Sequence, residues 1–364
     1  LQDVERVGLA PVMVTDGPHG LRKQVRDADH VGLNKSVPAT CFPTACALAS
    51  TWDVALLETV GEALGRECAA EHVTVLLGPG LNIKRHPFCG RNFEYFSEDP
   101  LLSGKLAAAM VRGVQSQGVG TSIKHFAVNN QEHGRMYIDA IVDERTLREI
   151  YLRGFEIAVR EAQPWTVMCA YNRLNGSFCS EHDWLLNRVL RKEWGFNGLV
   201  VTDWGAANDR VEGIRGGLDL EMPSSGGVND KLVMQAVNDG YLQESELDRA
   251  VQRNVSLSLL GADLQASEHG VDLEAHHALA HRAATESAVL LKNEAQLLPL
   301  NAHANIAVIG AFARRPRYQG TGSSQVNPTQ LDNAWDALQQ LCNELDYAPG
   351  YDPKHSNIDQ VLID

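Results

Sequence analysis

Short apolar runs alternate with longer stretches of helical periodicity along most of the chain. Each run is rich in Val, Leu, Ile or Met and is apolar at successive positions, which is typical of strands that are covered on both faces. The expected strands are residues 11–15, 73–78, 122–125, 166–170, 199–202 and 218–222. The expected helices between them cover about residues 53–71, 101–117, 143–162, 184–194 and 244–260. This alternation predicts parallel strands joined by right-handed crossovers.

The clearest helical pattern covers residues 143–162. Apolar side chains recur there at spacings of three and four residues, at Leu147, Ile150, Tyr151, Phe155 and Ala158. Residues at this spacing lie on one face of an α-helix, so the pattern predicts one continuous helix with a single apolar face.

Polar residues at the ends of the expected strands distinguish two α/β architectures. Strand after strand ends in a residue able to do chemistry, and these residues are Asp16, Lys124, His125, Met168, Tyr171, Asp203 and Glu221. A doubly wound sheet concentrates its chemistry at one switch point, whereas a (β/α) barrel draws catalytic groups from the ends of several strands. We therefore predict an α/β fold with a (β/α) TIM-like barrel over residues 1–265.

A second α/β domain is expected to begin after this barrel. Residues 266–300 are interpreted as a linker with a helix at about 276–292, and residues 301–364 as the first part of the new domain. That part starts with a strand at 306–310 and continues into a glycine-rich loop at 320–324. Because the chain begins at Leu1 without Met and stops at Asp364 inside an unfinished unit, we expect it to be truncated.

Charge and cysteine content narrow the classes of function. The 364 residues include 32 Lys and Arg against 46 Asp and Glu, and the net charge of −14 disfavours a nucleic-acid partner. No apolar run reaches the roughly 18 residues that a membrane span needs. The seven cysteines are odd in number and lack a CxxC pair, which predicts mostly buried free thiols rather than a disulfide scaffold or a zinc site. The compartment is not readable, but this usage favours a cytoplasmic or periplasmic location over secretion as a disulfide-rich protein.

Asp203 is the strongest candidate for a catalytic residue. It follows the apolar run at 198–202 and precedes Trp204 and Gly205. A carboxylate beside an indole suits work on a sugar, because the carboxylate can attack or stabilise an oxocarbenium-like centre while the indole packs on the apolar face of the ring. The structural alternative is an Asp that caps the next helix.

Four further positions are candidates for binding sugar hydroxyls. Lys124 and His125 can both turn into the mouth of a barrel at the end of a strand; the alternative is a surface Lys beside a core His. Asp16 and Arg22 lie in a loop with two glycines and a proline, and they can bracket a polyol or simply form a tight turn.

Two more charged positions each leave two interpretations open. Arg91 lies in a loop dense in charged and aromatic residues and can donate paired hydrogen bonds to a ligand, or it can form a salt bridge to Glu94, Glu98 or Asp99. Glu221 is either a second catalytic carboxylate or, as the pattern favours, a structural acceptor at a strand end.

Four runs of residues resemble glycoside hydrolase family 3, and most of all its β-glucosidases. They are Val-Thr-Asp-Gly-Pro-His-Gly-Leu-Arg at 14–22, Gly-Arg-Asn-Phe-Glu-Tyr-Phe-Ser-Glu-Asp-Pro at 90–100, Ile-Lys-His-Phe-Ala-Val-Asn-Asn-Gln-Glu at 123–132 and Val-Val-Thr-Asp-Trp-Gly at 200–205. The β-N-acetylglucosaminidases of the family carry Lys-His-Phe-Pro-Gly after the strand, so Lys-His-Phe-Ala-Val argues against that branch. The resemblance implies a (β/α) barrel followed by an α/β sandwich domain.

The resemblance also implies roles for individual residues. Asp203 becomes the nucleophile of a retaining double displacement, and Ser323 or Ser324 closes the pocket from the second domain. The residues expected to hold sugar hydroxyls are Asp16, Arg22, Arg91, Lys124, His125, Arg135 and Tyr171, and those expected to line the apolar surface are Met168 and Trp204. No metal or cofactor is expected. The family's acid/base Glu is expected beyond Asp364, so the remainder of the same polypeptide is an expected partner.

The function predicted from these observations is that of an exo-acting retaining β-glucosidase. Its substrate would be a β-glucoside or a cello-oligosaccharide, and Lys124 would keep Asp203 ionised together with the neighbouring arginines. The alternatives are a β-xylosidase of the same family and a non-catalytic sugar-binding relative. An acyl-transfer hydrolase is excluded for want of a GxSxG elbow. The oligomeric state stays open, with a homo-oligomer among the options.

Overall fold

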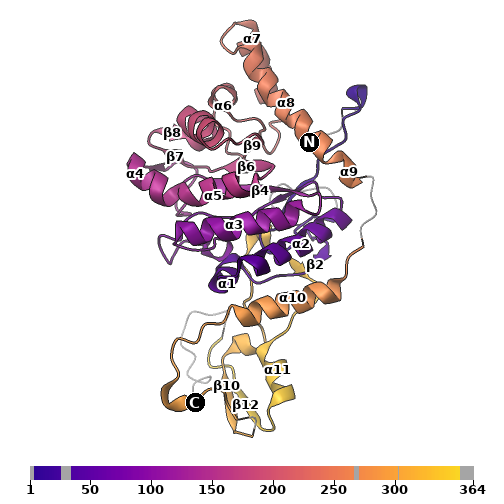
Figure 1. Ribbon diagram of the computed structural model, residues 1–364, viewed down its shortest axis with the longest axis vertical. Coiled ribbons are helices and arrows are strands. Elements are labelled where there is room, and N and C mark those ends of the chain that lie inside the picture. The colour runs from indigo at the N-terminus through magenta and orange to yellow at the C-terminus, as the bar shows by residue number, and fades with distance from the viewer. Residues whose placement is uncertain (1–3, 26–33, 266–269, 302, 353–364) are drawn as a thin grey trace.

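The computed structural model describes residues 4–25, 34–265, 270–301 and 303–352 (Figure 1). Its centre is a curled parallel sheet of five strands in the order β1-β3-β4-β6-β9. The strands are β1 (Val14–Asp16), β3 (Val75–Leu77), β4 (Gly120–Phe126), β6 (Thr166–Cys169) and β9 (Leu199–Thr202). The prediction of an α/β fold with a TIM-like parallel sheet is confirmed. Within the described residues, these strands form an arc of a barrel.

The strand expected at residues 218–222 is wrong. Only Leu220 pairs there, through one parallel bridge to Val201. Two backbone hydrogen bonds form this bridge, from the N–H of Leu220 to the carbonyl of Val200 and from the N–H of Thr202 to the carbonyl of Leu220, both at 3.1 Å. Beyond it, the side chain of Thr202 accepts from the N–H of Met222 at 2.7 Å and donates to its carbonyl at 3.0 Å.

Crossover helices cover the outer face of this arc. They are α2 (Val54–Ala70), α3 (Pro100–Gln115), α5 (Arg153–Ala162) and the π-helix η5 (Trp184–Glu193), and in Figure 1 the first three lie side by side. Each of the first two begins at a capping aspartate. Asp53 accepts from two backbone N–H groups of α2, and Asp99 does the same for α3, which has Pro100 in its first turn.

The helix expected at 143–162 is not one continuous α-helix. It starts as α4 (Glu144–Thr146), widens into a π-helical turn, η3 (Leu147–Tyr151), and continues as α5. A π turn holds an extra residue, so the apolar stripe loses its register there. Leu147 and Phe155 remain buried, whereas Ile150 is 38% exposed.

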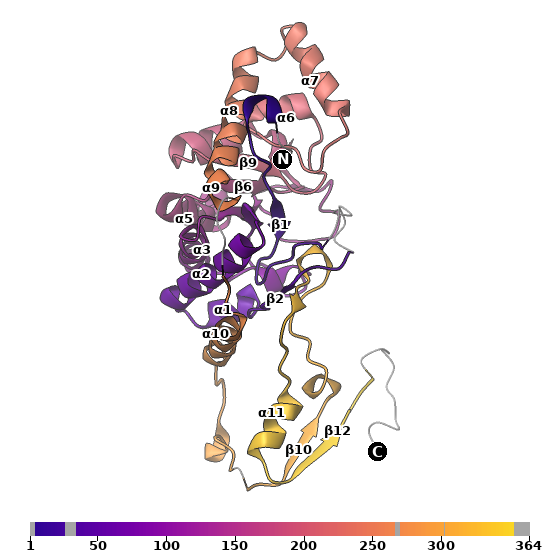
Figure 2. The ribbon, with the colours of Figure 1, turned by 90° about the vertical axis from the view of Figure 1, so that its right-hand side faces the viewer.

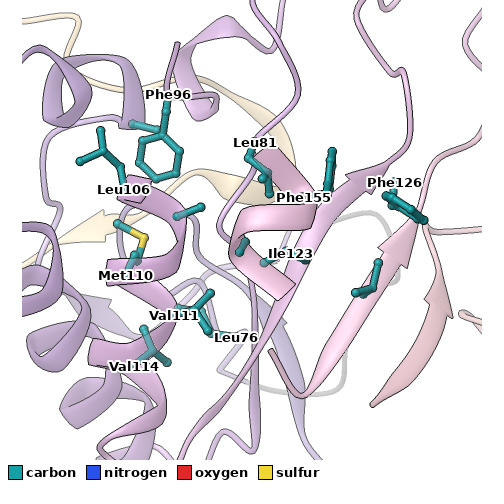
Figure 3. Packing of buried hydrophobic residues seen from close by; sticks show 14 of the residues in the cluster. Leu76, Leu81, Phe96, Leu106, Met110, Val111, Val114, Ile123, Phe126 and Phe155 are labelled. Atoms are coloured by element: carbon teal, nitrogen blue, oxygen red, sulfur yellow. The ribbon is translucent and has the colours of Figure 1, made fainter. Parts of the chain in front are cut away.

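The main core lies between the sheet and these helices (Figure 3). Strands β3, β4, β6 and β9 are buried at every position, as expected for strands covered on both faces. Leu76 and Ile123 from the strands join Met110 and Val114 from α3 in one cluster. This packing fixes the positions of the strands, and therefore of the residues at their ends.

The remaining helices and strands are short or peripheral. After β9 come α6 (Arg210–Gly216), α7 (Val228–Asn238), α8 (Glu244–Leu260) and α9 (Ala262–Gln265). Earlier in the chain lie α1 (Ala45–Ser50) and a small sheet of β5 (Asp139–Ala140), β7 (Arg173–Leu174) and β8 (Ser177–Phe178). None of the helices in the described ranges is long and apolar enough to cross a membrane.

The helix expected at 276–292 is α10 (Leu273–Glu286), so it starts and ends earlier than predicted. It packs on α1 and α2, and a buried hydrogen bond joins the Nδ1 atom of His276 to the Oε1 atom of Glu67 at 2.7 Å. The other carboxylate oxygen of Glu67 accepts from the backbone N–H of Thr40 at 2.9 Å. The segment that follows the first sheet is therefore fastened to it.

The last part of the chain forms a second small sheet. Strands β10 (Ile306–Ile309) and β12 (Leu345–Ala348) pair in parallel, with α11 (Ala334–Leu341) between them in the chain. Figure 2 shows the segment between β10 and α11 rising to the first domain, where β11 (Asn327–Pro328) pairs with β2 (Pro38–Ala39). All seven cysteines are free, and three of them, Cys68, Cys169 and Cys179, are buried.

A buried carboxylate ties the end of the sheet to α8. Asp219 is 3% exposed and contacts Arg191 at 2.5 Å, Arg253 at 2.8 Å and the backbone N–H of Val200 at 2.7 Å. We expect Asp219→Ala to lower the free energy of unfolding by about 3–5 kcal/mol, because it leaves two cations without their shared partner. Urea unfolding followed by circular dichroism measures this change.

The matched control is Glu149→Ala, which removes an exposed i,i+4 pair with Arg145. Its expected cost is below about 1 kcal/mol. Equal losses in the two variants would show that Asp219 does not organise this part of the fold.

Candidate active site

The carboxyl ends of the strands open into a cavity of about 1130 Å³. Side chains at or just after the ends of β1, β4, β6 and β9 line its floor, and the loop at residues 319–324 lines one wall. Every residue expected at the site from the sequence lines this cavity. These residues are Asp16, Arg22, Arg91, Lys124, His125, Arg135, Met168, Tyr171, Asp203, Trp204 and Ser323.

Asp203 comes directly after β9, and its carboxylate has one oxygen bound and one open. The Oδ1 atom accepts from the N–H of Trp204 at 2.7 Å. The Oδ2 atom has no hydrogen-bond partner among the described residues; it lies 3.5 Å from Nε2 of His125 and 4.0 Å from a guanidinium nitrogen of Arg91. With its side chain only 13% exposed, Asp203 presents a single buried oxygen to the cavity.

Burial raises the pKa of the Asp203 carboxyl above its ordinary value of 3.8, although Arg91, the N–H of Trp204 and Lys124 oppose the shift. Nearby cations were expected to keep this carboxylate ionised. They do favour the ionised form, but the loss of water outweighs them in setting the direction of the shift.

Lys124 and His125 directly precede the last residue of β4, and both line the cavity. The peptide bond between them is cis. The Nζ atom of Lys124 lies 3.0 Å from Oδ1 of Asp16 and 3.9 Å from Oε2 of Glu94. Because Lys124 is only 2% exposed, the alternative of a surface lysine is excluded.

The imidazole of His125 is held between Tyr95 and Asp203. Its Nδ1 atom lies 2.9 Å from the hydroxyl of Tyr95, and its backbone exchanges two hydrogen bonds with the side chain of Asn82, at 2.7 and 2.8 Å. Burial, with Arg91 and Lys124, lowers the pKa of His125 well below its ordinary value, so the ring is neutral at pH 7. A neutral ring that accepts at Nδ1 carries its proton on Nε2, facing Asp203.

Glu94 is the charged residue whose importance the sequence did not show. It is 2% exposed, forms an ion pair with Arg91 and lies within 3.9 Å of Lys124. Burial opposes ionisation, but Arg91 and Lys124 prevail and lower the pKa of Glu94. The salt-bridge interpretation of Arg91 is therefore correct, and Arg91 lines the cavity as well. The available signal was the spacing of three residues between Arg91 and Glu94, which one helical turn brings together.

Tyr171 and two arginines form the side of the cavity. The guanidinium of Arg135 lies 4.7 Å from the ring centre of Tyr171 and 2.5 Å from the Glu132 carboxylate. The hydroxyl of Tyr171 donates to the carbonyl of Trp204 at 2.9 Å. Arg22 is buried and donates to the carbonyl of Asn34 at 2.7 Å, which helps to fix its guanidinium.

Apolar side chains also line the cavity. Met168 is 3% exposed and belongs to a cluster with Leu77 and Val75, and Trp204 packs against this cluster. Cations, carboxylates and an apolar patch in one cavity match the surface of a sugar, which carries hydroxyls at its edge and C–H groups on its faces.

Glu221 does not belong to this set. Its Oε1 atom accepts from Nδ2 of Asn229 at 2.7 Å, and Arg210 lies 3.9 Å from its other oxygen. It is the structural acceptor that the pattern favoured. In the part of the chain that the structure describes, no group of three His, Cys, Asp or Glu residues is placed to hold a metal ion.

Two family models match the chain. The one described as the glycosyl hydrolase family 3 N terminal domain covers residues 12–257, and the one for the C-terminal domain of the same family covers residues 288–361. This chain belongs to glycosyl hydrolase family 3. The family resemblance stated from the four motifs is confirmed.

Individual relatives within the family have related names. The chain is 56% identical over 363 residues to thermostable beta-glucosidase B of Acetivibrio thermocellus, covering 99% of this chain and 48% of the relative. It is 50% identical over 362 residues to an exo-alpha-(1->6)-L-arabinopyranosidase of Bifidobacterium longum, covering 96% of this chain and 48% of the relative. It thus spans about half the length of these curated relatives.

Solved structures of family 3 enzymes share the fold. A crystal structure of a Bifidobacterium adolescentis GH3 beta-glucosidase is 48% identical, with a TM-score of 0.91 over 100% of this chain and 52% of that one. A structure of beta-glucosidase 3B from Thermotoga neapolitana in complex with alpha-D-glucose is 44% identical, with a TM-score of 0.89 over 95% of this chain and 49% of that one.

The raised pKa of Asp203 has a consequence for stability. A carboxyl whose folded pKa lies above its unfolded pKa binds its proton more readily when folded, so its ionised form costs stability at any pH above the folded value. We expect Asp203→Asn to raise the melting temperature (Tm) at pH 7, and the gain to shrink as the pH falls through the pKa of the folded wild type and Asp203 becomes protonated. Thermal unfolding at several pH values measures this.

The control variant is Asp248→Asn, an exposed position on α8 away from the cavity. It should leave Tm nearly unchanged at each pH. A lower Tm for Asp203→Asn at pH 7 would mean that contacts with Arg91 and His125 outweigh the cost of burying the charge.

Proposed function

We propose that this chain forms the nucleophile-bearing and sugar-binding part of an exo-acting retaining β-glucosidase. It would release terminal non-reducing β-D-glucosyl residues from oligosaccharides or from aryl and alkyl glucosides. The observation that carries the proposal is the open Oδ2 atom of Asp203, which faces a cavity lined by Arg91, Lys124 and His125. The beta-glucosidase names of family 3 relatives support it.

In the proposed reaction, Oδ2 of Asp203 attacks the anomeric carbon and the bond to the leaving oxygen breaks. A second carboxyl group protonates that oxygen, then takes a proton from the water that hydrolyses the glycosyl–Asp203 ester. His125 is neutral and directs Nε2 at the nucleophile, so it orients the carboxylate without adding a full positive charge that would weaken it as a nucleophile.

The acid/base is not assigned to a residue of this chain. The other carboxylates described in the cavity, Asp16, Glu94 and Glu132, are each paired with a cation: Lys124, Arg91 and Arg135 in that order. We therefore place the acid/base on the part of the relatives' length that this chain does not span.

Binding of the sugar follows from alternating charges on the cavity floor. Asp16 accepts and Lys124 donates at 3.0 Å from each other, a separation that suits two neighbouring hydroxyls of one ring. Arg91 and Arg135 are further donors. Met168 and Trp204 provide an apolar patch for the C–H face of the sugar, while the charged residues bind the hydroxyls at its edge.

Trapping the covalent intermediate tests the proposal. A 2-fluoro β-glucosyl inactivator slows both steps of a retaining mechanism, so brief exposure of the full-length protein should leave an adduct on the peptide that contains Asp203. Mass spectrometry locates the adduct, and Asp203→Asn serves as the unlabelled control. An adduct elsewhere, or none in a protein that hydrolyses aryl β-glucosides, would contradict the assignment of the nucleophile.

A panel of aryl glycosides tests the choice of sugar. Aryl β-D-glucoside should have the largest kcat/KM, with β-D-xyloside and α-L-arabinopyranoside below it. The xyloside stands for the β-xylosidase alternative, and the arabinopyranoside for the activity named for one family 3 relative. Binding of glucose without hydrolysis of any member would favour the non-catalytic sugar-binding alternative.

Glu94 holds both Arg91 and Lys124, so its charge should matter for the reaction although it does not face the nucleophile. We expect Glu94→Gln to lower kcat/KM on the aryl β-glucoside by about 10- to 100-fold, the equivalent of about 1.5–3 kcal/mol for a buried charge-assisted hydrogen bond. Glu98→Gln, in the same motif but exposed, is the matched control and should stay within about twofold of wild type. A Glu94→Gln enzyme with unchanged kcat/KM would remove Glu94 from the site.

A further inference from the structure

One wall of the cavity comes from a short loop of the second domain, residues 319–326, which we call the wall loop. Its residues Gln319 to Ser324 line the cavity that holds Asp203. Ser323 is exposed in the cavity mouth and Ser324 is 5% exposed. Nothing in the sequence pattern indicated what holds this loop in place.

A single side-chain amide closes the wall loop at its base. The Nε2 atom of Gln319 donates to the carbonyl of Val326 at 3.0 Å, and the N–H of Val326 donates to the Oε1 atom of Gln319 at 2.8 Å. The amide therefore pairs with both backbone groups of one residue, as a neighbouring strand would. This pairing joins the first and last residues of the loop and limits the shapes that the loop can adopt.

The closing residue is itself buried in the first domain. Val326 is 2% exposed and belongs to the main hydrophobic core. A Cβ atom at Gly20 would lie 2.7 Å from a methyl group of Val326, so Gly20 leaves the space that this side chain fills. The pairing of β11 with β2 follows at once, and the N–H of Thr329 donates to the carbonyl of Ala39 at 3.0 Å.

The other end of the wall loop lies against the motif that carries Arg91 and Glu94. A Cβ atom at Gly320 would lie only 2.4 Å from the ring of Phe93. The ring therefore packs directly on the backbone of the loop, and a side chain at position 320 would require the ring of Phe93 to shift. Phe93 in turn meets the buried ring of His19 edge to face, with 6.2 Å between the ring centres.

We propose that Gln319 and Gly320 are positioning residues that hold the wall loop as a fixed wall of the sugar cavity, with Ser323 and Ser324 turned toward the bound sugar. The inference deepens the proposed function and rests on it. Both ends of the loop are tied, one by Val326 and one by Phe93, so the loop is already in place before a sugar binds.

Double-mutant kinetics in the full-length protein separate positioning from a general structural role. Gln319→Ala should lower kcat/KM on the aryl β-glucoside about tenfold, mainly through KM, because two hydrogen bonds to Val326 are lost. The same change in a Ser323→Ala/Ser324→Ala background should cost less than about twofold, because the serines through which it acts are gone. An equal loss in both backgrounds would overturn the proposal.

Two further variants sharpen this kinetic test. Gln325→Ala removes an exposed amide of the same loop that does not line the cavity, and should leave kcat/KM and KM near those of wild type. Gly320→Ala should raise KM, and adding Phe93→Leu should recover part of that loss by making room for the new methyl group. No recovery in the double variant would show that contact with Phe93 is not what Gly320 provides.

Hydrogen exchange gives a readout that does not depend on turnover. Exchange at the amide of Val326 should accelerate by at least about tenfold in Gln319→Ala and stay unchanged in Gln325→Ala. Unchanged exchange in Gln319→Ala would overturn the proposal even in an active enzyme. A wild type that hydrolyses no glycoside of the panel would instead overturn the proposed function, and exchange at Val326 alone would then decide whether Gln319 fixes the loop.

Discussion

The Asp203 carboxylate lies next to Arg91 and His125 in a place from which most water is excluded, and the other features of the site compensate for this burial. An unpaired buried carboxylate is costly, and one fully neutralised by hydrogen bonds is a poor nucleophile. The structure meets both requirements by binding one oxygen to the N–H of Trp204 and leaving the other open near two groups at 3.5 and 4.0 Å. At these distances the two groups attract the carboxylate electrostatically. They form no hydrogen bond with its Oδ2 atom, so the lone pairs of that atom stay available for reaction.

The need to balance buried charges also explains the carboxylates Glu94 and Asp16 that surround the two cations of the site. Arg91 and Lys124 stabilise the carboxylate, but two buried cations repel each other and need partners of their own. Glu94 contacts Arg91 and lies 3.9 Å from Lys124, and Asp16 lies 3.0 Å from Lys124, so each cation on the floor has a carboxylate partner. Such an array presents both donors and acceptors to a polyol, which means that stabilising the nucleophile and binding the substrate draw on the same side chains.

Much of this arrangement was predictable from the sequence, because strand ends and motifs are local. Asp203 after an apolar run and Lys124-His125 at the end of another identified the floor of the cavity. The π turn at Leu147–Tyr151 was not predictable, since a spacing of three and four residues tolerates one inserted residue. The burial of Glu94 was not predictable either, because its partner Lys124 lies 30 positions away and only the folded sheet brings the two within 3.9 Å.

The contacts between the second domain and the first could not be predicted from the sequence, because they join residues far apart in the chain. These contacts also hold the loop that forms one wall of the cavity. Gln319 closes a loop on Val326, and Val326 is buried beside Gly20, about 300 positions earlier in the chain. Glu67 binds the linker helix through His276 and also the backbone of Thr40, next to the strand that pairs with β11. The two connections meet at β2, so the linker helix and the wall loop are fastened to the same edge of the first domain. The buried contact between Glu67 and His276 therefore lies at the edge of the first domain to which the wall loop is attached, although neither residue lines the cavity.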